Sequence, residues 1–594
     1  MKHFLGLVAI SDILIVSSMM ATPLLAQKKS SLFLAYPPPE HQTTAEKIFL
    51  IGTASPEAEV SVNGKAITNR SKMGHFAPSF PLKLGKNVFT LRHQNAELKI
   101  TVIRNSAVPE IPTGIAFAED SLTPAVNIDR LPEEFVCFGA IAPPKAEVNV
   151  SIGGKSIALL PQRAIALPPN SAVLTAEADT VNVAAGIYQG CTVFETSGNL
   201  GKPIFELDLQ GKTVTKEGTG EITILDRAEI EVVEVTADEG VARTGASTDY
   251  SRLTPLPKGT RARVTGREGE WLRLDYGGWI KAEETKPVVG NTLPHSLIRG
   301  ITSRQIAGAT EIIFPLQTPV PVAVTQGEKQ ITLSLYNTTA QTDTIKVASD
   351  PVIQRLDWQQ VTPTKIDYTF QLKNQQQWGY DLRYEGTNLI FTLRHSPQIL
   401  PSSSFLSDRS LAGIEILLDP GHGGSESGSI GPTGYPEKKI NLIMSQLVAA
   451  ELKKMGATVY LTRETDTDLS LQERVDIINN TKPDLAISIH YNALPDSGDA
   501  LNTQGISTFW YHPQAEDLAS FLHSYLVENL NRPNYGVYWN NLALTRPHTA
   551  PAILLELGFM INPQEFEWIT DAREQKKLAA AIAQGIKEWF GRVK

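Results

Sequence analysis

Short stretches in which apolar and polar residues alternate dominate the chain from about residue 28 to residue 395. The segment 59–62, Glu-Val-Ser-Val, is typical, because a period of two predicts a strand with one buried face. The Asn63-Gly64 pair that follows predicts a tight hairpin, and segment 148–152 with its Gly153-Gly154 pair repeats the pattern. After residue 411, longer apolar runs are separated by segments with helical spacing. The pattern predicts several all-β domains followed by a C-terminal α/β domain.

Breaks in this pattern divide the chain further, as its length of 594 residues also requires. A proline-containing seam at residues 108–112 follows the first β-rich region, and the serine-rich stretch 396–410 is the clearest linker. The predicted divisions are a β-sandwich-like domain (27–108), a second β-rich domain (109–226), a compact β segment (230–288), a further β-domain (295–395), the linker (396–410) and the α/β domain (411–594).

The α/β domain is predicted to hold a parallel or mixed sheet with helices on both faces. Its expected elements are strands at 414–418, 458–462, 485–489 and 552–555, and helices at about 437–455 and 470–480. The first strand stops at Pro420 and Gly421, so His422 lies just beyond its end. In open α/β sheets this rim is where ligands and metals bind.

Three more side chains with useful chemistry occupy comparable positions. Glu437 lies in the first turn of a helix, His490 follows a strand, and Glu556 interrupts an apolar strand. Two His and one Glu, with one position left for water, form a common catalytic zinc set. A metal hydrolase also needs a nearby carboxylate as proton carrier. The sequence therefore predicts Zn²⁺ on His422, Glu437 and His490, with Glu556 as the catalytic residue.

Each of these residues also has a simpler interpretation. Glu437 could be only a charge favoured by the helix dipole, and His490 alone would be a core histidine at a strand end. Their occurrence with His422 in one domain favours a metal set. Because a buried unpaired carboxylate is costly, we favour catalysis for Glu556 over a plain buried ion pair. Asp419, beside the turn, could orient His422 or equally cap the turn.

Other histidines are left out of the metal set. His523 lies in an amphipathic segment and is expected at the surface, whereas His548 is expected to line the cleft because it precedes the Glu556 strand. His41 and His75 are expected to be surface or loop residues.

Four ordered blocks make the α/β domain resemble a known family. LLDPGHGG, EKKINL, SIHYNA and LLELGF, within residues 414–590, resemble the zinc-dependent N-acetylmuramoyl-L-alanine amidases of bacterial cell walls. The resemblance implies zinc ligands at His422, Glu437 and His490 and a catalytic Glu556. Tyr491 stands where a small residue is usual, and residues 425–427 replace a more usual Asp-Pro pair. Neither departure removes a ligand.

Two of the β regions carry further resemblances. Residues 230–288 resemble a bacterial SH3 module and residues 295–395 loosely resemble an AMIN module, which implies targeting to the wall. The SH3 resemblance rests on Val241–Gly245, Leu256–Gly259, Gly269–Leu274 and Gly278–Ile280. Trp271 is favoured as a core residue. Trp358, Trp378, Tyr380 and Tyr384 suit a sugar-stacking face and a sandwich core equally well.

Composition narrows the setting. A net charge of −9 argues against nucleic-acid binding, which needs a basic face. No internal stretch is apolar enough to span a bilayer. Residues 1–26, with an apolar run ending in a small-residue site at Ala26, predict a signal peptide. An exported protein is thus expected, in a periplasm or cell wall. Cys137 and Cys191 could pair there or remain buried free thiols.

The combined expectation is an exported peptidoglycan hydrolase that cleaves the amide between N-acetylmuramic acid and L-alanine. This bond is implied by the resemblance, since spacing alone supports only a zinc amide hydrolase. The alternatives are a zinc peptidase acting within the stem peptide and a non-catalytic wall-binding scaffold. Some relatives carry a helix after the second His block that plugs the site. Residues 492–508 look loop-like, so no such helix is expected, while an activator protein is left open as a partner.

Overall fold

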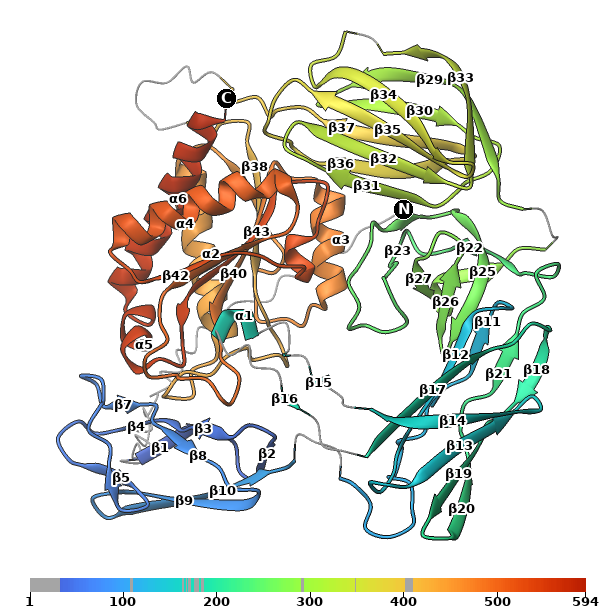
Figure 1. Cartoon of the computed structure of the whole chain (residues 1–594). Helices are drawn as coiled ribbons and strands as arrows, with labels where there is room; N and C mark the ends of the chain where they lie inside the picture. Colours follow the sequence, from blue (N-terminus) through green and yellow to red (C-terminus); the bar gives the residue numbers. More distant parts are fainter. Residues whose placement is uncertain are drawn as a thin grey trace, which may run out of the picture.

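The computed structural model describes residues 32–106, 110–162, 165–166, 168, 172–175, 181–182, 186–289, 293–347, 349–400 and 410–593. The predicted signal peptide and residues 401–409 of the predicted linker lie outside the described residues. Within them, β-rich domains precede a C-terminal α/β domain, as predicted (Figure 1). Among the helices described, none combines the length and apolarity needed to cross a bilayer.

The first β domain, blue in Figure 1, consists of small sheets around an apolar core. Its sheets have the orders β1-β4-β7, β2-β10-β9-β5-β6 and β3-β8. The strands are β1 (Leu32–Tyr36), β2 (His41–Thr43), β3 (Lys47–Phe49), β4 (Ile51–Ala54), β5 (Val60–Val62), β6 (Lys65–Ala66), β7 (His75–Phe76), β8 (Ser79–Pro81), β9 (Gly85–His93) and β10 (Ala96–Arg104). Asn63 and Gly64 join β5 to β6 with φ of 49° and 79°, which confirms the predicted hairpin.

The second β region contains a six-stranded sheet of order β12-β17-β14-β13-β19-β20. Its elements are β11 (Ile128–Arg130), β12 (Phe135–Ile141), β13 (Glu147–Ile152), β14 (Lys155–Gln162), β15 (Ile165–Ala166), α1 (Ala172–Thr175), β16 (Val181–Asn182), β17 (Ile187–Val193), β18 (Gly198–Gly201), β19 (Ile204–Leu209), β20 (Lys212–Glu217) and β21 (Ile222–Ile224). The predicted hairpin at Gly153-Gly154 joins β13 to β14. Cys137 and Cys191 lie opposite each other on β12 and β17 and form a disulfide, so of the two alternatives the pair is the one observed.

The third β region shares a sheet with the second. Its elements are β22 (Val232–Val235), β23 (Glu239–Gly240), β24 (Leu256–Pro257), β25 (Arg261–Glu268), β26 (Trp271–Leu274), β27 (Trp279–Lys281), η1 (Ala282–Glu284) and β28 (Thr285–Pro287). Because β25 pairs with β11, the order β18-β21-β11-β25-β22-β28 runs across the division predicted at residues 226–230. Trp271 is buried, as expected of a core residue.

The fourth β region is a sandwich of two sheets, β33-β29-β30-β37-β36 and β31-β32-β35-β34, around one apolar core. Its strands are β29 (Ser296–Ile306), β30 (Ala309–Pro315), β31 (Val322–Gln326), β32 (Gln330–Tyr336), β33 (Thr338–Lys346), β34 (Ile353–Thr362), β35 (Lys365–Leu372), β36 (Tyr380–Glu385) and β37 (Asn388–Arg394). Trp378 and Tyr380 are buried and Tyr384 is half-buried against the core, whereas Trp358 is exposed. The four aromatic residues therefore do not form one sugar-stacking face.

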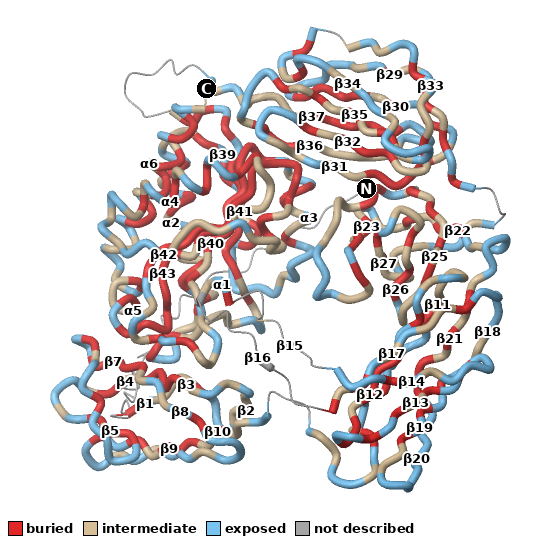
Figure 2. Tube along the Cα trace, viewed as in Figure 1, coloured by how far each residue is buried: buried red, intermediate tan, exposed pale blue. Residues whose placement is uncertain are grey.

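The α/β domain has a six-stranded mixed sheet of order β39-β38-β40-β43-β41-β42, in which β41 is antiparallel to β43. Its elements are β38 (Glu415–Pro420), α2 (Glu437–Lys454), β39 (Thr458–Leu461), α3 (Leu471–Thr481), β40 (Leu485–Asn492), β41 (Ile506–Trp510), η2 (Pro513–Ala515), α4 (Glu516–Leu530), β42 (Asn534–Trp539), η3 (Ala543–Thr545), β43 (Ala552–Phe559), α5 (Pro563–Ile569) and α6 (Ala572–Arg592). Helices α2, α4 and α6 share one core with the sheet, and α3 packs in a second core that includes Leu417 and Ala486. Figure 2 shows buried residues concentrated along these central strands.

The first β domain docks directly on the α/β domain. Phe49 and Ile51 share an apolar cluster with Phe559, the last residue of the Glu556 strand, and with Ile561 just beyond it. The ring of His75 packs edge-on against Phe566, with 5.3 Å between centroids. The expectation that His75 is a surface residue is wrong, because the sequence of one domain does not reveal the partner that covers it.

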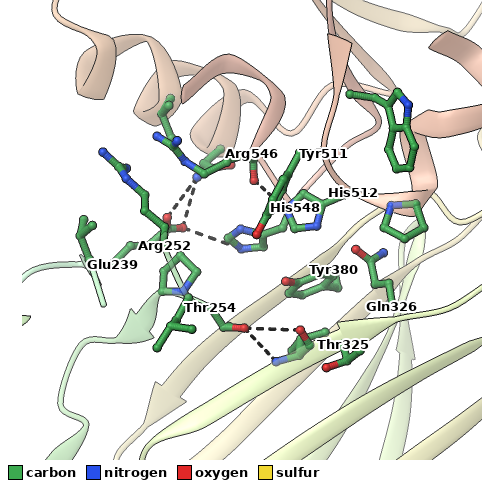
Figure 3. Close-up of a pocket in the computed structure, with 18 of the residues that line it drawn as sticks. Glu239, Arg252, Thr254, Thr325, Gln326, Tyr380, Tyr511, His512, Arg546 and His548 are labelled. Atoms are coloured by element: carbon green, nitrogen blue, oxygen red, sulfur yellow. Dashed lines mark hydrogen bonds and ion pairs between the residues drawn. The ribbon is translucent and has the colours of Figure 1, made fainter. Parts of the chain in front are cut away.

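The fourth β region docks on the other side of the same domain. Trp378 stacks on Phe590 with 5.9 Å between ring centroids, and Arg394 forms an ion pair of 3.0 Å with Asp484. Between this region, the third β region and the α/β domain lies a cavity (Figure 3).

Candidate metal centre

Three separate elements bring His422, Glu437 and His490 together. His422 follows β38, Glu437 is the first residue of α2, and His490 lies near the end of β40. Because β38 and β40 are adjacent and parallel, their carboxyl ends meet at one edge of the sheet. The sequence predicted this edge correctly.

The donor atoms of these residues converge. One donor atom from each residue lies within 4.8 Å of the other two. Oε2 of Glu437 is 3.3 Å from Nε2 of His422, and Oε1 is 3.2 Å from Nδ1 of His490. The two imidazole rings are nearly perpendicular, with centroids 4.9 Å apart. The group thus presents two imidazoles and one carboxylate to a single point.

The Glu437 carboxylate is buried and held by donors from three segments. It accepts hydrogen bonds from the Ser429 and Tyr491 backbone N–H groups at 2.8 and 3.0 Å, and from Nδ2 of Asn441 at 2.9 Å. Burial alone would raise the pKa of Glu437, but the hydrogen bonds and charges of His422 and His490 outweigh it and hold the pKa well below its usual range. Glu437 is therefore ionised and oriented, as a metal ligand requires.

Glu556 lies beside this group on β43. It pairs in register with His490 on β40 and with Ser507 on β41. Its Oε2 atom is buried and has no hydrogen-bond partner among the residues that the structure describes. Burial raises the pKa of Glu556 well above its usual range, and the charge of Glu437 adds to the rise. A buried carboxyl oxygen with nothing to bind is costly unless a ligand or a water completes it.

These observations fit a zinc ion. Nitrogen and carboxylate donors are the ligands that catalytic zinc takes, with one position left open. His422 and His490 are only half-buried, so the group is open on one side. A bound cation would also offset the like-charge pair of Glu437 and Glu556.

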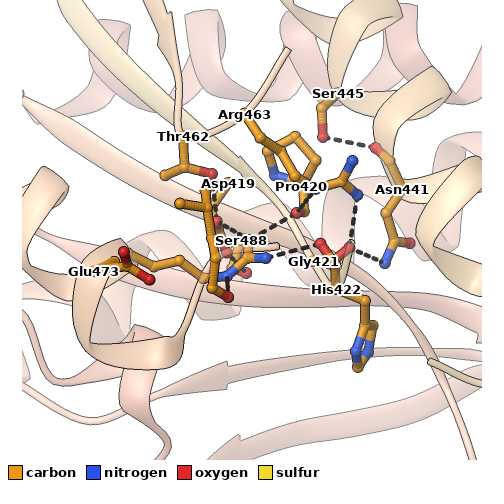
Figure 4. Close-up of polar contacts among 12 residues, drawn as sticks. Asp419, Pro420, Gly421, His422, Asn441, Ser445, Thr462, Arg463, Glu473 and Ser488 are labelled. Carbon is orange, nitrogen blue, oxygen red and sulfur yellow. Dashed lines mark hydrogen bonds and ion pairs between the residues drawn. The ribbon is translucent and has the colours of Figure 1, made fainter. Parts of the chain in front are cut away.

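A polar network behind the metal group fixes the turn that carries His422 (Figure 4). Asp419 is fully buried and accepts hydrogen bonds from Arg474 at 2.7 Å, Thr462 at 2.5 Å and Ser488 at 2.6 Å. Arg474 in turn donates to the backbone carbonyl of His422 at 2.7 Å. Asp419 thus acts on His422 through Arg474, and neither direct role considered for it is observed.

A second arginine completes the support. Arg463 donates to the carbonyl oxygens of Pro420 and Gly421, both at 2.9 Å, and to that of Lys438 at 2.8 Å. It therefore ties the end of β38 to the first turn of α2. These bonds hold His422 in a left-handed conformation, with φ of 58°, that few non-glycine residues adopt. Neither arginine was expected at the site from the sequence, although Arg474 falls on the buried face of an amphipathic helix.

Gly421 allows His490 to approach the turn. A Cβ atom at this position would lie 2.1 Å from Cε1 of His490, well inside van der Waals contact. The close approach of the two strand ends therefore depends on the absence of a side chain at Gly421.

The remaining histidines of the domain lie elsewhere. His523 is buried against Thr508 and Asn534, so its expected surface position is wrong. His548 does not line the metal cleft. It precedes β43, and the N-terminal end of this strand lies far from Glu556, which is near the C-terminal end. Its ring stacks on Tyr380 of the fourth β region with centroids 4.8 Å apart.

The segment after His490 is a loop that contacts the first β domain. Within residues 493–505, all of which are described, there are turns but no helix. Asp496 in this loop is 2.8 Å from Nε2 of His41 and also accepts a hydrogen bond from the Tyr36 hydroxyl. The first β domain thus contacts the loop that follows His490, which the sequence did not reveal.

Comparison with known proteins places this domain in a family context. Residues 416–588 match the family described as N-acetylmuramoyl-L-alanine amidase. A probable cell wall amidase, LytH, of Staphylococcus epidermidis is 36% identical over 200 residues, which cover 33% of this chain and 65% of that protein. The LytH of Staphylococcus aureus is 37% identical over 182 residues, covering 30% of this chain and 60% of that protein.

A solved structure is similar over the same part. The catalytic domain of CwlV, an N-acetylmuramoyl-L-alanine amidase from Bacillus (Paenibacillus) polymyxa var. colistinus, is 32% identical, with coverage of 30% of this chain and 99% of that one and a TM-score of 0.29. The chain spans somewhat less than two thirds of the length of the curated relatives it matches. The family match and the LytH relatives therefore support an amidase domain within residues 416–588.

Proposed function

We propose that this protein is a zinc-dependent N-acetylmuramoyl-L-alanine amidase that acts on peptidoglycan outside the cytoplasm. The observation that carries the proposal is the convergence of His422, Glu437 and His490 beside the unpaired Oε2 atom of Glu556. It occurs in a domain that matches the amidase family.

In this proposal, Nε2 of His422, Nδ1 of His490 and the Glu437 carboxylate hold the zinc ion. When bound, zinc supplies Lewis acidity, which polarises an amide carbonyl and makes water acidic near neutral pH. The Ser429, Tyr491 and Asn441 donors keep the Glu437 carboxylate oriented toward the ion.

Glu556 is the proton carrier. With a bound cation favouring its ionised form, its Oε2 atom would remove a proton from the attacking water as the new carbon–oxygen bond forms at the lactyl carbonyl. The same carboxyl then gives the proton to the amide nitrogen as the carbon–nitrogen bond breaks. The products are a sugar with a free lactyl carboxylate and a peptide with a free L-alanine amino group. Because no residue that the structure describes bonds to Oε2 of Glu556, this atom is free to exchange the proton.

The direct test compares full-length wild-type protein with Glu556→Gln on purified peptidoglycan, with zinc content measured for both. We expect release of stem peptides by the wild type and a rate at least about 10²-fold lower for the variant, because it removes the proton carrier. Zinc should remain near one per chain in both. Glu516→Gln, at an exposed carboxylate in α4, is the matched control and should behave as wild type.

Other outcomes distinguish the alternatives. Full activity of Glu556→Gln would refute its catalytic role. Zinc binding without any cleavage would favour the wall-binding scaffold or reveal the need for an activator protein. Cleavage only within the stem peptide would favour the zinc peptidase. Absence of zinc from the wild type would refute the ligand set.

A further inference from the structure

The cavity at the junction of three domains is distinct from the metal centre. It has a volume of about 400 Å³ and is lined by residues of the third β region, the fourth β region and the α/β domain. This volume lies within the range of cavities that bind small molecules. No residue of the proposed metal centre lines it.

The two sites lie at opposite ends of the strands of the same sheet. Strand β41 is antiparallel to β43, with Ser507 opposite Glu556 and Trp510 opposite Ile553. The chain therefore moves away from Glu556 along β41 and enters the cavity wall at Trp510 and Tyr511. At about 3.3 Å per residue, the three steps from Glu556 to Ile553 alone separate the sites by about 10 Å.

Arginine side chains give the cavity a positive wall. Arg252 and Arg546 line it from different domains (Figure 3). Arg243 lies next to Arg252 in a β-bridge. Within the described part of the chain, none of the three forms an ion pair with a carboxylate. Burial lowers the pKa of Arg546 to about 9, and the charges of Arg252 and Arg243 add to the fall. An anion would relieve this repulsion.

The carboxylate in the cavity wall does not neutralise these arginines, because it is engaged elsewhere. Both oxygens of Glu239 accept from Nδ2 of Asn479, at 3.3 and 3.2 Å, and one is 3.9 Å from Nε2 of His548. Glu239 thus ties the third β region to α3. Among the described residues that line the cavity, no other carboxylate faces the arginines; Glu284, outside the lining, acts on Arg252 and Arg243 through its charge but forms no ion pair with them.

Aromatic rings form another part of the lining. Tyr511 and Trp539 lie 5.3 Å apart, and Trp539 is 61% exposed despite its size. Its ring is held in place, because Nε1 donates to the carbonyl of Tyr511 at 3.0 Å. A fixed, exposed indole beside a pocket offers a flat apolar surface to a ligand ring.

From these features we infer that the cavity binds a carboxylate-bearing amino sugar, with the carboxylate on Arg252 and Arg546 and the sugar ring against Trp539. Planar guanidinium groups suit a carboxylate because they can donate two parallel hydrogen bonds. The inference rests on the proposed function for the choice of sugar, since the amidase reaction leaves a lactyl carboxylate on each sugar that it cleaves. The cavity would hold the cleaved part of the glycan strand while the metal centre acts on a sugar further along the same glycan strand.

The experiment measures binding of N-acetylmuramic acid to the full-length protein by calorimetry, with N-acetylglucosamine as the matched neutral sugar. N-acetylmuramic acid should bind at least about 10-fold more tightly, because a hydrogen-bonded charge is lost in the other sugar. Arg252→Met should remove this preference, whereas Arg573→Met, at an exposed arginine of α6, should keep it. Since the ligand would bridge the third β region and the α/β domain, it should also raise the melting temperature.

Chelation of zinc and the Glu556→Gln substitution separate this site from the metal centre. Both should leave binding unchanged, so the cavity inference can hold even if the amidase proposal fails. Equal affinity for the two sugars, no detectable binding of either, or full binding by both Arg252→Met and Arg546→Met would overturn the inference. Loss of binding on zinc removal would assign the sugar to the metal centre and would also overturn it.

Discussion

Replacement of Gly421 by alanine tests the geometry of the proposed metal centre without replacing any of its ligands. The added Cβ would lie 2.1 Å from Cε1 and 2.5 Å from Nδ1 of His490. Ordinary contact begins near 3.4 Å, so the ring or the turn must shift by about 1 Å. The turn cannot yield easily, because Arg463 and Arg474 bind the carbonyls on both sides of it.

A shift of this size is large for a metal site. Metal–ligand distances are fixed to within about 0.2 Å, so His490 should be lost as a ligand. Zinc affinity should fall on the order of 100-fold or more, because even residues behind the ligands contribute 10- to 100-fold. Overpacking should also cost about 1–3 kcal/mol of stability, which leaves the protein folded.

The assay is competition for zinc with a chromogenic chelator, with circular dichroism to establish that the variant is folded. Gly591→Ala is the matched control, because no atom lies within 4 Å of the position its Cβ would take. A folded Gly421→Ala protein that binds zinc as tightly as wild type would refute the proposed ligand arrangement.

Three further predictions concern stability. Arg474→Met should cost about 3–5 kcal/mol in urea unfolding, because it leaves the buried Asp419 carboxylate unpaired; an unchanged midpoint would contradict this. Burial raises the pKa of Glu565 to about 7, so wild-type stability should fall as pH rises from about 4.5 to 7, by up to about 1.4 kcal/mol per unit, and Glu565→Gln should flatten the profile. Reduction of Cys137–Cys191, which are 54 residues apart, should destabilise the second β region by about 4 kcal/mol, measurable as a lower melting temperature with dithiothreitol.

The position of the candidate site was predictable because it depends on local patterns. Apolar strands that stop at His422 and His490 identify a sheet edge, and a helix that begins at Glu437 supplies a carboxylate to the same edge. Glu556 was conspicuous because it breaks an apolar strand. These signals lie within a few residues of each functional group, so one sequence was sufficient.

The support of the site was not predictable in the same way. Arg463 and Arg474 act on backbone carbonyls that are distant in sequence, and no local pattern indicates such a contact. His548 was expected at the cleft beside Glu556 but lies at the other end of the strand, because proximity in sequence does not specify at which end of a strand a residue lies. Eight residues separate His548 from Glu556, and the strand between them crosses the sheet.

The contacts between the β domains and the α/β domain could not be predicted from the sequence, for a related reason. His75 and Trp378 are covered by residues of the α/β domain, and β11 pairs with β25 across a predicted domain boundary. Alternation of apolar and polar residues predicts that a strand has a buried face. It does not state which neighbour buries that face.

Hydrolysis of purified peptidoglycan in water enriched with ¹⁸O, followed by mass spectrometry of both products, tests the central claim most directly. A zinc amidase acting on the lactyl amide should place one ¹⁸O atom in the sugar carboxylate and release peptides that begin with L-alanine and carry no label. Label within the peptides, with the sugars still substituted, would contradict the proposed bond and favour a peptidase that uses the same four residues.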